Sequence, residues 1–271
     1  MPLTVPAHQL AMLPVKLAWP RYTDATAMCI GSAAPDLGNA VVGGGNHGLA
    51  SIMFSVPFTL IMSALIRWRA GAGVFANLPD LGPFRVHSYR VIVTRRPAWW
   101  ITLLGACFGV ATHILIDAFT HTGRWGATWV GLNDHLLTLP IRGDLSEARA
   151  LQYVGHTLGS LAAALLILHI GRGRLLERWY GTDAVAVARR FELTRRSRWR
   201  FWTVVTAFTV LSTGLLTPLV GQALFTPMLG AAIGLVVGGS LPEYRDPNLL
   251  AVAAATRAGP STSGMASGRR L

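Results

Sequence analysis

The sequence predicts an all-α protein, a polytopic transmembrane helical bundle with five to six membrane segments. Three observations predict this class. Hydrophobic residues make up 52% of the 271 residues and charged residues only 13%, which is too apolar for an ordinary soluble chain. Apolar runs of roughly 20 residues recur, and a helix of that length crosses a hydrocarbon core about 30 Å thick. Arginines are concentrated in alternate loops, as the positive-inside rule expects of a membrane protein.

The apolar runs give the expected elements in order. The first, Ala25–Val42, is weaker than the others because Pro35 and Asp36 interrupt it, so it either spans the membrane or re-enters. The clear runs are Leu49–Ile66, Ala98–Phe119, Leu151–Ile170, Phe201–Val220 and Ala223–Leu241. The short connection between the last two makes 201–241 a helix pair, which we expect to be structural.

The basic residues predict the topology. The loop 67–97 holds six arginines, the loop 171–200 nine and the segment after Leu241 four, whereas 120–150 holds only three. The positive-inside rule therefore places the first two loops and the C-terminus in the cytoplasm, and 120–150 outside. We attribute the net charge of +12 to this arrangement and expect no nucleic-acid partner.

The domain organisation follows from the same patterns. Residues 1–243 form the helical membrane domain, and the small, polar residues of 244–271 predict a disordered cytoplasmic tail. Residues 175–198 form either a basic amphipathic helix on the cytoplasmic surface or a solvated connector.

The strongest functional signal is a polar stripe inside the apolar run 98–119. His113, Asp117 and His121 follow each other at intervals of four, so on a helix they share one face. Ionisable groups at membrane depth are costly and mark a functional site by default. The stripe predicts first a metal centre and second a purely structural polar cluster.

Other polar residues are expected at the same depth near the outer face. His156 follows within the first two turns of the next apolar run, and His47 precedes the run that starts at Leu49. Asp36 lies one short loop earlier, where it acts at the site or caps a helix that begins at Leu37. Both histidines also have non-functional interpretations. His156 could form a hydrogen bond across a helix interface, and His47 could lie at the membrane–water interface without binding a ligand. Imidazoles and carboxylates together suit zinc, with manganese or iron possible.

The ordered motifs resemble a bacterial family of multi-spanning membrane proteins of unknown function. The resemblance covers roughly 1–240 and rests on His8, Gly31-Ser32-Ala33-Ala34-Pro35-Asp36, His47, the segment 113–121, and Gln152-Tyr-Val-Gly-His156. That family is similar to the inner-membrane metal-dependent hydrolases and distantly to zinc-dependent phospholipase C. The resemblance implies a cell inner membrane location and seven polar-site residues, namely His8, Asp36, His47, His113, Asp117, His121 and His156.

His8 poses a topological problem within this set. If 25–42 spans the membrane, His8 lies on the opposite side from the others, so the resemblance favours a re-entrant or shallow N-terminal segment.

These expectations lead to a functional hypothesis with two rivals. The hypothesis is a metal-dependent hydrolase that acts on a lipid or envelope-derived ester, phosphoester or amide at the outer side of the membrane. His8, His47, His113, Asp117 and His156 would bind the metal, and Asp36 and His121 would be catalytic. The rivals are a transporter or ion-handling protein that uses the same cluster, and a structural membrane subunit.

Overall fold

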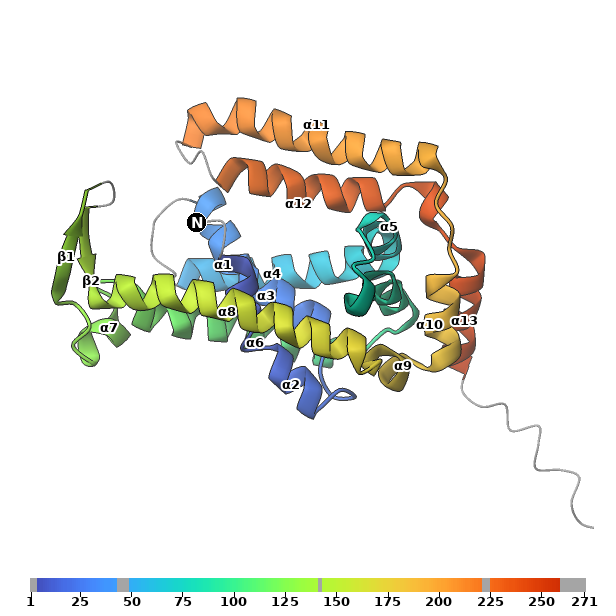
Figure 1. Cartoon of the computed structure of the whole chain (residues 1–271), viewed down its shortest axis with the longest axis horizontal. Coiled ribbons are helices and arrows are strands. Elements are labelled where there is room, and N and C mark those ends of the chain that lie inside the picture. Colours follow the sequence, from blue (N-terminus) through green and yellow to red (C-terminus); the bar gives the residue numbers. More distant parts are fainter. Residues whose placement is uncertain (1–3, 43–48, 141–142, 221–224, 259–271) are drawn as a thin grey trace, which may run out of the picture.

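The computed structural model describes residues 4–42, 49–140, 143–220 and 225–258 (Figure 1). It confirms the all-α prediction, because helices make up most of the described chain. The first half contains α1 (Thr4–Gln9), α2 (Leu13–Ala18), α3 (Ala25–Val42), α4 (Leu49–Leu65), η1 (Ile66–Ala70), α5 (Gly71–Asn77), η2 (Gly82–Phe84), η3 (Val86–Thr94) and α6 (Trp99–Thr120). The second half contains α7 (Trp125–Trp129), β1 (His135–Leu139), β2 (Gly143–Ser146), α8 (Glu147–Arg172), α9 (Leu175–Tyr180), α10 (Thr182–Arg189), α11 (Arg195–Val220), α12 (Phe225–Gly239), η4 (Pro242–Tyr244) and α13 (Pro247–Ala258).

Four helical segments of the described chain are long and apolar enough to cross a membrane. They are Ile52–Asn77, Trp99–Thr120, Glu147–Arg172 and Arg195–Pro218. Two further predicted segments are helical but are not among these four: α12 has only 15 residues, and α3 carries Pro35 within its 18 residues. The protein is therefore a helical membrane protein by the length and composition of its helices.

The long helices lie roughly along the long axis of the molecule (Figure 1). The antiparallel hairpin of β1 and β2 lies at one end, and α9, α10 and α13 lie at the other. The α11–α12 pair packs against η1 and α5 through α12. This layout gives the molecule two chemically different ends, which we call the hairpin end and the arginine-rich end.

Close packing of α3 on α6 fixes the core of the bundle. A Cβ atom on Gly109 of α6 would clash with the backbone oxygen of Met28 and lie only 2.8 Å from the backbone nitrogen of Ser32. Membrane helices use such small residues to bring two backbones together. Ser32 and Asp36 of α3 are consequently held beside the second half of α6.

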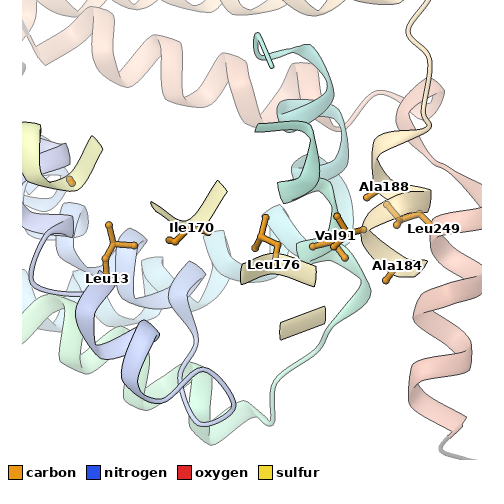
Figure 2. Close-up of a cluster of buried hydrophobic side chains, with 9 residues drawn as sticks. Leu13, Val91, Ile170, Leu176, Ala184, Ala188 and Leu249 are labelled. Carbon is orange, nitrogen blue, oxygen red and sulfur yellow. The ribbon is translucent and has the colours of Figure 1, made fainter. Parts of the chain in front are cut away.

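A cluster of buried hydrophobic side chains packs several helices together toward the arginine-rich end. Figure 2 shows it with Leu13 of α2, Ile170 of α8, Val91 of η3, Ala184 and Ala188 of α10, and Leu249 of α13 among its members. Segment 175–198, for which the sequence left a helix and a solvated connector open, thus contributes helix α10 to the packed core.

The structure corrects the prediction of a disordered tail for residues 247–258. They form α13, which begins where the Asp246 carboxylate accepts hydrogen bonds from the backbone N–H groups of Asn248 at 3.0 Å and Leu249 at 3.3 Å. An aspartate in this position caps a helix. Burial of Leu249 against Val91 then holds the helix to the protein.

Candidate metal centre

The polar stripe of α6 lies in the half of this helix that is nearer the hairpin end. His113 is fully buried and Asp117 is 3% exposed. The Nε2 atom of His113 lies 3.3 Å from Oδ2 of Asp117. His121 follows the last residue of the helix, and its Nδ1 atom lies 3.7 Å from Oδ1 of Asp117. The spacing of four residues thus brings both histidines to one carboxylate.

Helix α3 orients the His113 ring. Nδ1 of His113 lies 2.7 Å from the carbonyl oxygen of Ser32. A carbonyl only accepts hydrogen bonds, so Nδ1 carries a proton, and in the neutral ring the lone pair is then on Nε2. Metal-binding histidines are commonly held this way. Asp36, one turn further along α3, places Oδ1 3.6 Å from the same Nε2 atom, and its side chain is 29% exposed.

Helix α1 brings His8 into the same cluster. Its ring stacks on that of His113 with 4.2 Å between the ring centroids, and its Nε2 atom lies 3.6 Å from Oδ1 of Asp117. The close approach of α1 to α8 has a local cause, because a Cβ on Gly159 would lie 3.0 Å from Cβ of Ala7. His8 reaches the other residues of the cluster because the six-residue helix α1 packs against α3, α6 and α8.

His8 is a neutral imidazole in this setting. Burial, and the neighbouring His113, lower the pKa of His8 to about 3. Its Nδ1 atom is buried and has no hydrogen-bond partner among the residues that the structure describes. A neutral ring with an unused nitrogen is what a metal site requires of a histidine.

Helix α8 borders the cluster on another side. Ser146 caps this helix and lies 2.5 Å from the hydroxyl of Thr122, hydroxyl to hydroxyl, which joins the start of α8 to the end of α6. The Gln152 amide nitrogen then lies 3.0 Å from Nε2 of His121. The His156 ring packs edge-on against His8, with 6.1 Å between centroids.

Within the described residues, His8, His113 and Asp117 form a group that could hold a metal ion. Each offers one donor atom, and these three atoms lie within 4.8 Å of one another, all in buried side chains. Zinc bonds of 2.0–2.2 Å in a tetrahedron place ligand atoms about 3.3 Å apart. Nε2 of His113 lies 3.3 Å from Oδ2 of Asp117, and Nε2 of His8 lies 3.6 Å from Oδ1. This group could therefore hold a divalent metal ion.

The other expected site residues fall into two groups. Asp36, His121 and His156 border the three-residue group, and His47 lies outside the described residues. Two other histidines lie elsewhere: His135 pairs with Asp144 on the exposed hairpin, and His87 lies 3.8 Å from Asp80.

Sequence reasoning missed a second buried polar group at the other end of α6. Asp24 forms an ion pair with Arg67 and accepts a 2.8 Å hydrogen bond from the Thr102 hydroxyl. Asp24 precedes one apolar run and Arg67 follows another. From the sequence alone, each is therefore interpreted as a solvent-exposed charged residue in a loop. Only the packing of α3 between α4 and α6 brings them together.

Comparison with known proteins identifies the family without an activity. No curated protein and no solved structure matches the chain. One family model matches residues 1–240, which include all seven polar-site residues named above. The chain therefore belongs to the family described as a domain of unknown function (DUF4184).

Proposed function

We propose that this protein is a membrane-embedded metal-dependent hydrolase. Its substrate would be a lipid or envelope-derived ester, phosphoester or amide, cleaved near the hairpin end. The observation that carries the proposal is the buried group of His8, His113 and Asp117, with its donor atoms within 4.8 Å of one another. Buried charged groups at membrane depth are expensive, so a site that retains them has a use for them.

Zinc is the metal that this donor set favours, with manganese or iron as alternatives. When bound, such an ion lowers the pKa of water to about 7 and polarises the bond to be cleaved. His8, His113 and Asp117 would hold it. His47 and His156 remain candidates for further ligands, His156 because its ring packs against His8.

Asp36 and His121 suit the proton transfers of hydrolysis. Asp36 lies beside His113 and is partly exposed, so it can accept a proton from the attacking water. The bond from carbonyl carbon or phosphorus to the leaving oxygen or nitrogen then breaks, and that atom takes up a proton. His121 is 36% exposed at its side chain and lies on the opposite side of Asp117 from His113. In this proposal His121 delivers that proton.

The rest of α6 supports hydrolysis more than transport. A transporter needs polar groups along a path to the other face. The buried residues of α6 between the cluster and the arginine-rich end are instead Gly105, Ala106, Gly109 and Val110, and Gly109 contacts the α3 backbone. These residues offer a passing ion no ligand side chain.

The orientation is also part of the proposal. In a bacterial inner membrane the arginine-rich end and the C-terminus would face the cytoplasm, and the metal centre would lie toward the outside.

An activity assay with matched variants tests the hydrolase proposal. Detergent-purified protein loaded with zinc is incubated with phosphatidylglycerol, a diacylglycerol and an N-acylated lipid, and the products are identified by mass spectrometry. We expect Asp36→Asn to lower the rate by about 100-fold or more, the range of a general base, while the protein retains its zinc. His169→Gln, an exposed site on α8, should leave the rate unchanged. Equal rates in wild type and Asp36→Asn on every substrate would refute the proposal.

A further inference from the structure

A second cavity lies at the opposite end of α6 from the metal centre. This basic pocket has a volume of about 190 Å³ and is lined by Lys16, Arg21, Asp24, Arg67, Arg95 and Arg96 among other residues. Ile101 lines it and precedes His113 by 12 residues, about 18 Å along a helix. The pocket is thus separate from the metal centre and plays no part in the proposed hydrolysis.

The pocket carries an excess of positive charge. Its single carboxylate, Asp24, is engaged by Arg67 and by the Thr102 hydroxyl. Within the described part of the chain, Lys16, Arg21, Arg95 and Arg96 make no ion pair with a carboxylate. Burial and the nearby Arg95 lower the pKa of Lys16 to about 8, which leaves this amine mainly protonated at pH 7. Lys16 donates to the carbonyls of Pro20 and Thr23 and Arg95 to that of Trp179, but these contacts leave the positive charges without a carboxylate, which favours an anionic ligand.

An apolar groove continues from the basic pocket. It has a volume of about 470 Å³, is lined by Val15, Met28, Leu104 and Phe108 among others, and shares Thr23, Asp24 and Ile101 with the basic pocket. Leu104 is 60% exposed and Phe108 is 40% exposed. A ligand that fills both spaces needs a negative head and an apolar chain.

Aromatic residues mark the depth of this double site. Four exposed aromatic residues lie close in sequence to the residues that line the pocket. Two follow α2 and two begin α6, namely Trp19, Tyr22, Trp99 and Trp100. Exposed tryptophan and tyrosine gather where lipid headgroups meet the hydrocarbon core. Basic pockets at this depth bind anionic headgroups.

We propose that the basic pocket and the apolar groove together bind one anionic phospholipid. The phosphate lies against Lys16, Arg21 and Arg95, and one acyl chain lies along α6 past Leu104 and Phe108. The lipid joins α2, α6 and the segment after η3 at the arginine-rich end. This binding does not depend on the hydrolase activity or on a metal ion.

Native mass spectrometry of the full detergent-purified chain tests the proposal. The probes are phosphatidylglycerol and phosphatidylcholine of the same chain length. We expect wild type to retain phosphatidylglycerol with at least about tenfold preference. The double variant Arg21→Gln/Arg95→Gln should reduce this binding by about tenfold or more. Arg195→Gln/Arg196→Gln removes the same charge from exposed residues outside the pocket and should bind as wild type does.

Two further arms separate a lipid from a simple anion. Cys107→Phe narrows the groove from an exposed position and should weaken phosphatidylglycerol binding without a change in charge. Inorganic phosphate at the same concentration should not displace the lipid. Equal retention of the two lipids, equal loss in the two arginine double variants, or displacement by inorganic phosphate would each overturn the proposal.

Discussion

In the candidate metal centre, the protonation of the proposed ligands is set by neighbouring groups that would not themselves contact the metal. The Ser32 carbonyl, 2.7 Å from Nδ1 of His113, selects the tautomer in which Nε2 can bind a metal. His8 owes its neutral state to burial. The role of each residue therefore follows from its place in the fold as much as from its type.

His8 provides the sharpest test at the residue scale. If His8 is a ligand, His8→Gln should lower zinc affinity by more than the roughly 10- to 100-fold that loss of a supporting hydrogen-bond partner costs. Competition with a fluorescent zinc chelator measures this affinity. His169→Gln is the matched control because His169 is exposed on α8, away from the cluster. An unchanged affinity in His8→Gln would remove His8 from the ligand set.

The sequence predicts part of the metal centre at this scale. The spacing of His113, Asp117 and His121 is visible without a structure, because residues four apart on a helix are neighbours. The contact of His8 with Asp117 depends on how α1 folds back and packs on α8, which no spacing encodes. For the same reason the Asp24–Arg67 pair, 43 positions apart, escaped prediction.

Helix contacts determine whether the residues of the metal centre meet. A Cβ at position 109 would meet the backbone of α3 and not a flexible side chain, so α3 and α6 would have to separate. Ser32 and Asp36 would then move away from His113.

Gly109→Ala tests this packing. We expect a loss of about 1–3 kcal/mol of stability, the usual cost of overpacking, together with weaker zinc binding. Thermal unfolding in detergent measures the first effect and chelator competition the second. Gly214→Ala is the control, since a Cβ there meets nothing within 4 Å. Equal stability of the two variants would contradict the proposed importance of the α3–α6 contact.

A buried arginine holds the elements of the arginine-rich end together. Arg90 of η3 donates to the carbonyls of Ala72 at 3.2 Å and Ala188 at 2.5 Å, and it lies 3.4 Å from the Asp246 carboxylate. Asp246 also caps α13. The Asp246 carboxylate therefore both pairs with the buried Arg90 and caps the last described helix, α13.

Asp246→Ala should destabilise this end strongly. The variant loses a helix cap, worth about 1 kcal/mol, and leaves a buried arginine without its carboxylate, which costs about 3–5 kcal/mol. We expect α13 to become sensitive to limited proteolysis in the variant. Asp183→Ala, at an exposed position of α10, should keep the wild-type pattern. Protection of α13 in Asp246→Ala would show that the pair is dispensable.

The helix α13 also shows why the disordered-tail prediction was wrong for 247–258. Asp246 followed by Pro247 is a helix-start pattern, with the capping residue before a proline at the first helical position, and alanines follow from Ala251. The prediction of disorder was based on the composition of the whole segment 244–271, which is rich in glycine and serine near its end, and so it did not take the local capping pattern into account. Composition averages over a segment, whereas capping acts at one residue.

Considered as a whole, the molecule separates two kinds of chemistry along its long axis. The His/Asp cluster lies toward the hairpin end, and the basic pocket lies at the arginine-rich end. Hydrophobic runs and arginine counts predicted that the arginine-rich loops and the His/Asp cluster lie at opposite ends of the helices, because both patterns can be read directly along the chain. They could not predict the hairpin or the basic pocket, which depend on packing.

Cysteine labelling tests the orientation of this axis. In a background with Cys29 and Cys107 replaced by serine, Asp134→Cys near the hairpin and Arg196→Cys at the start of α11 are treated with a membrane-impermeant maleimide on intact cells. We expect labelling at 134 only, and labelling at 196 after the cells are opened. Labelling at 196 on intact cells would reverse the proposed topology and place the metal centre toward the cytoplasm.

The central claim is that His8, His113 and Asp117 hold a metal ion, and elemental analysis tests it most directly. The full chain is purified in detergent as wild type, His113→Ala, Asp117→Ala and the control His169→Ala, with equal folding checked by circular dichroism and gel filtration. We predict close to one zinc, manganese or iron per chain in wild type and the control, and loss of that metal in the other two variants. Folded wild type that binds no metal after incubation with all three ions would contradict the account.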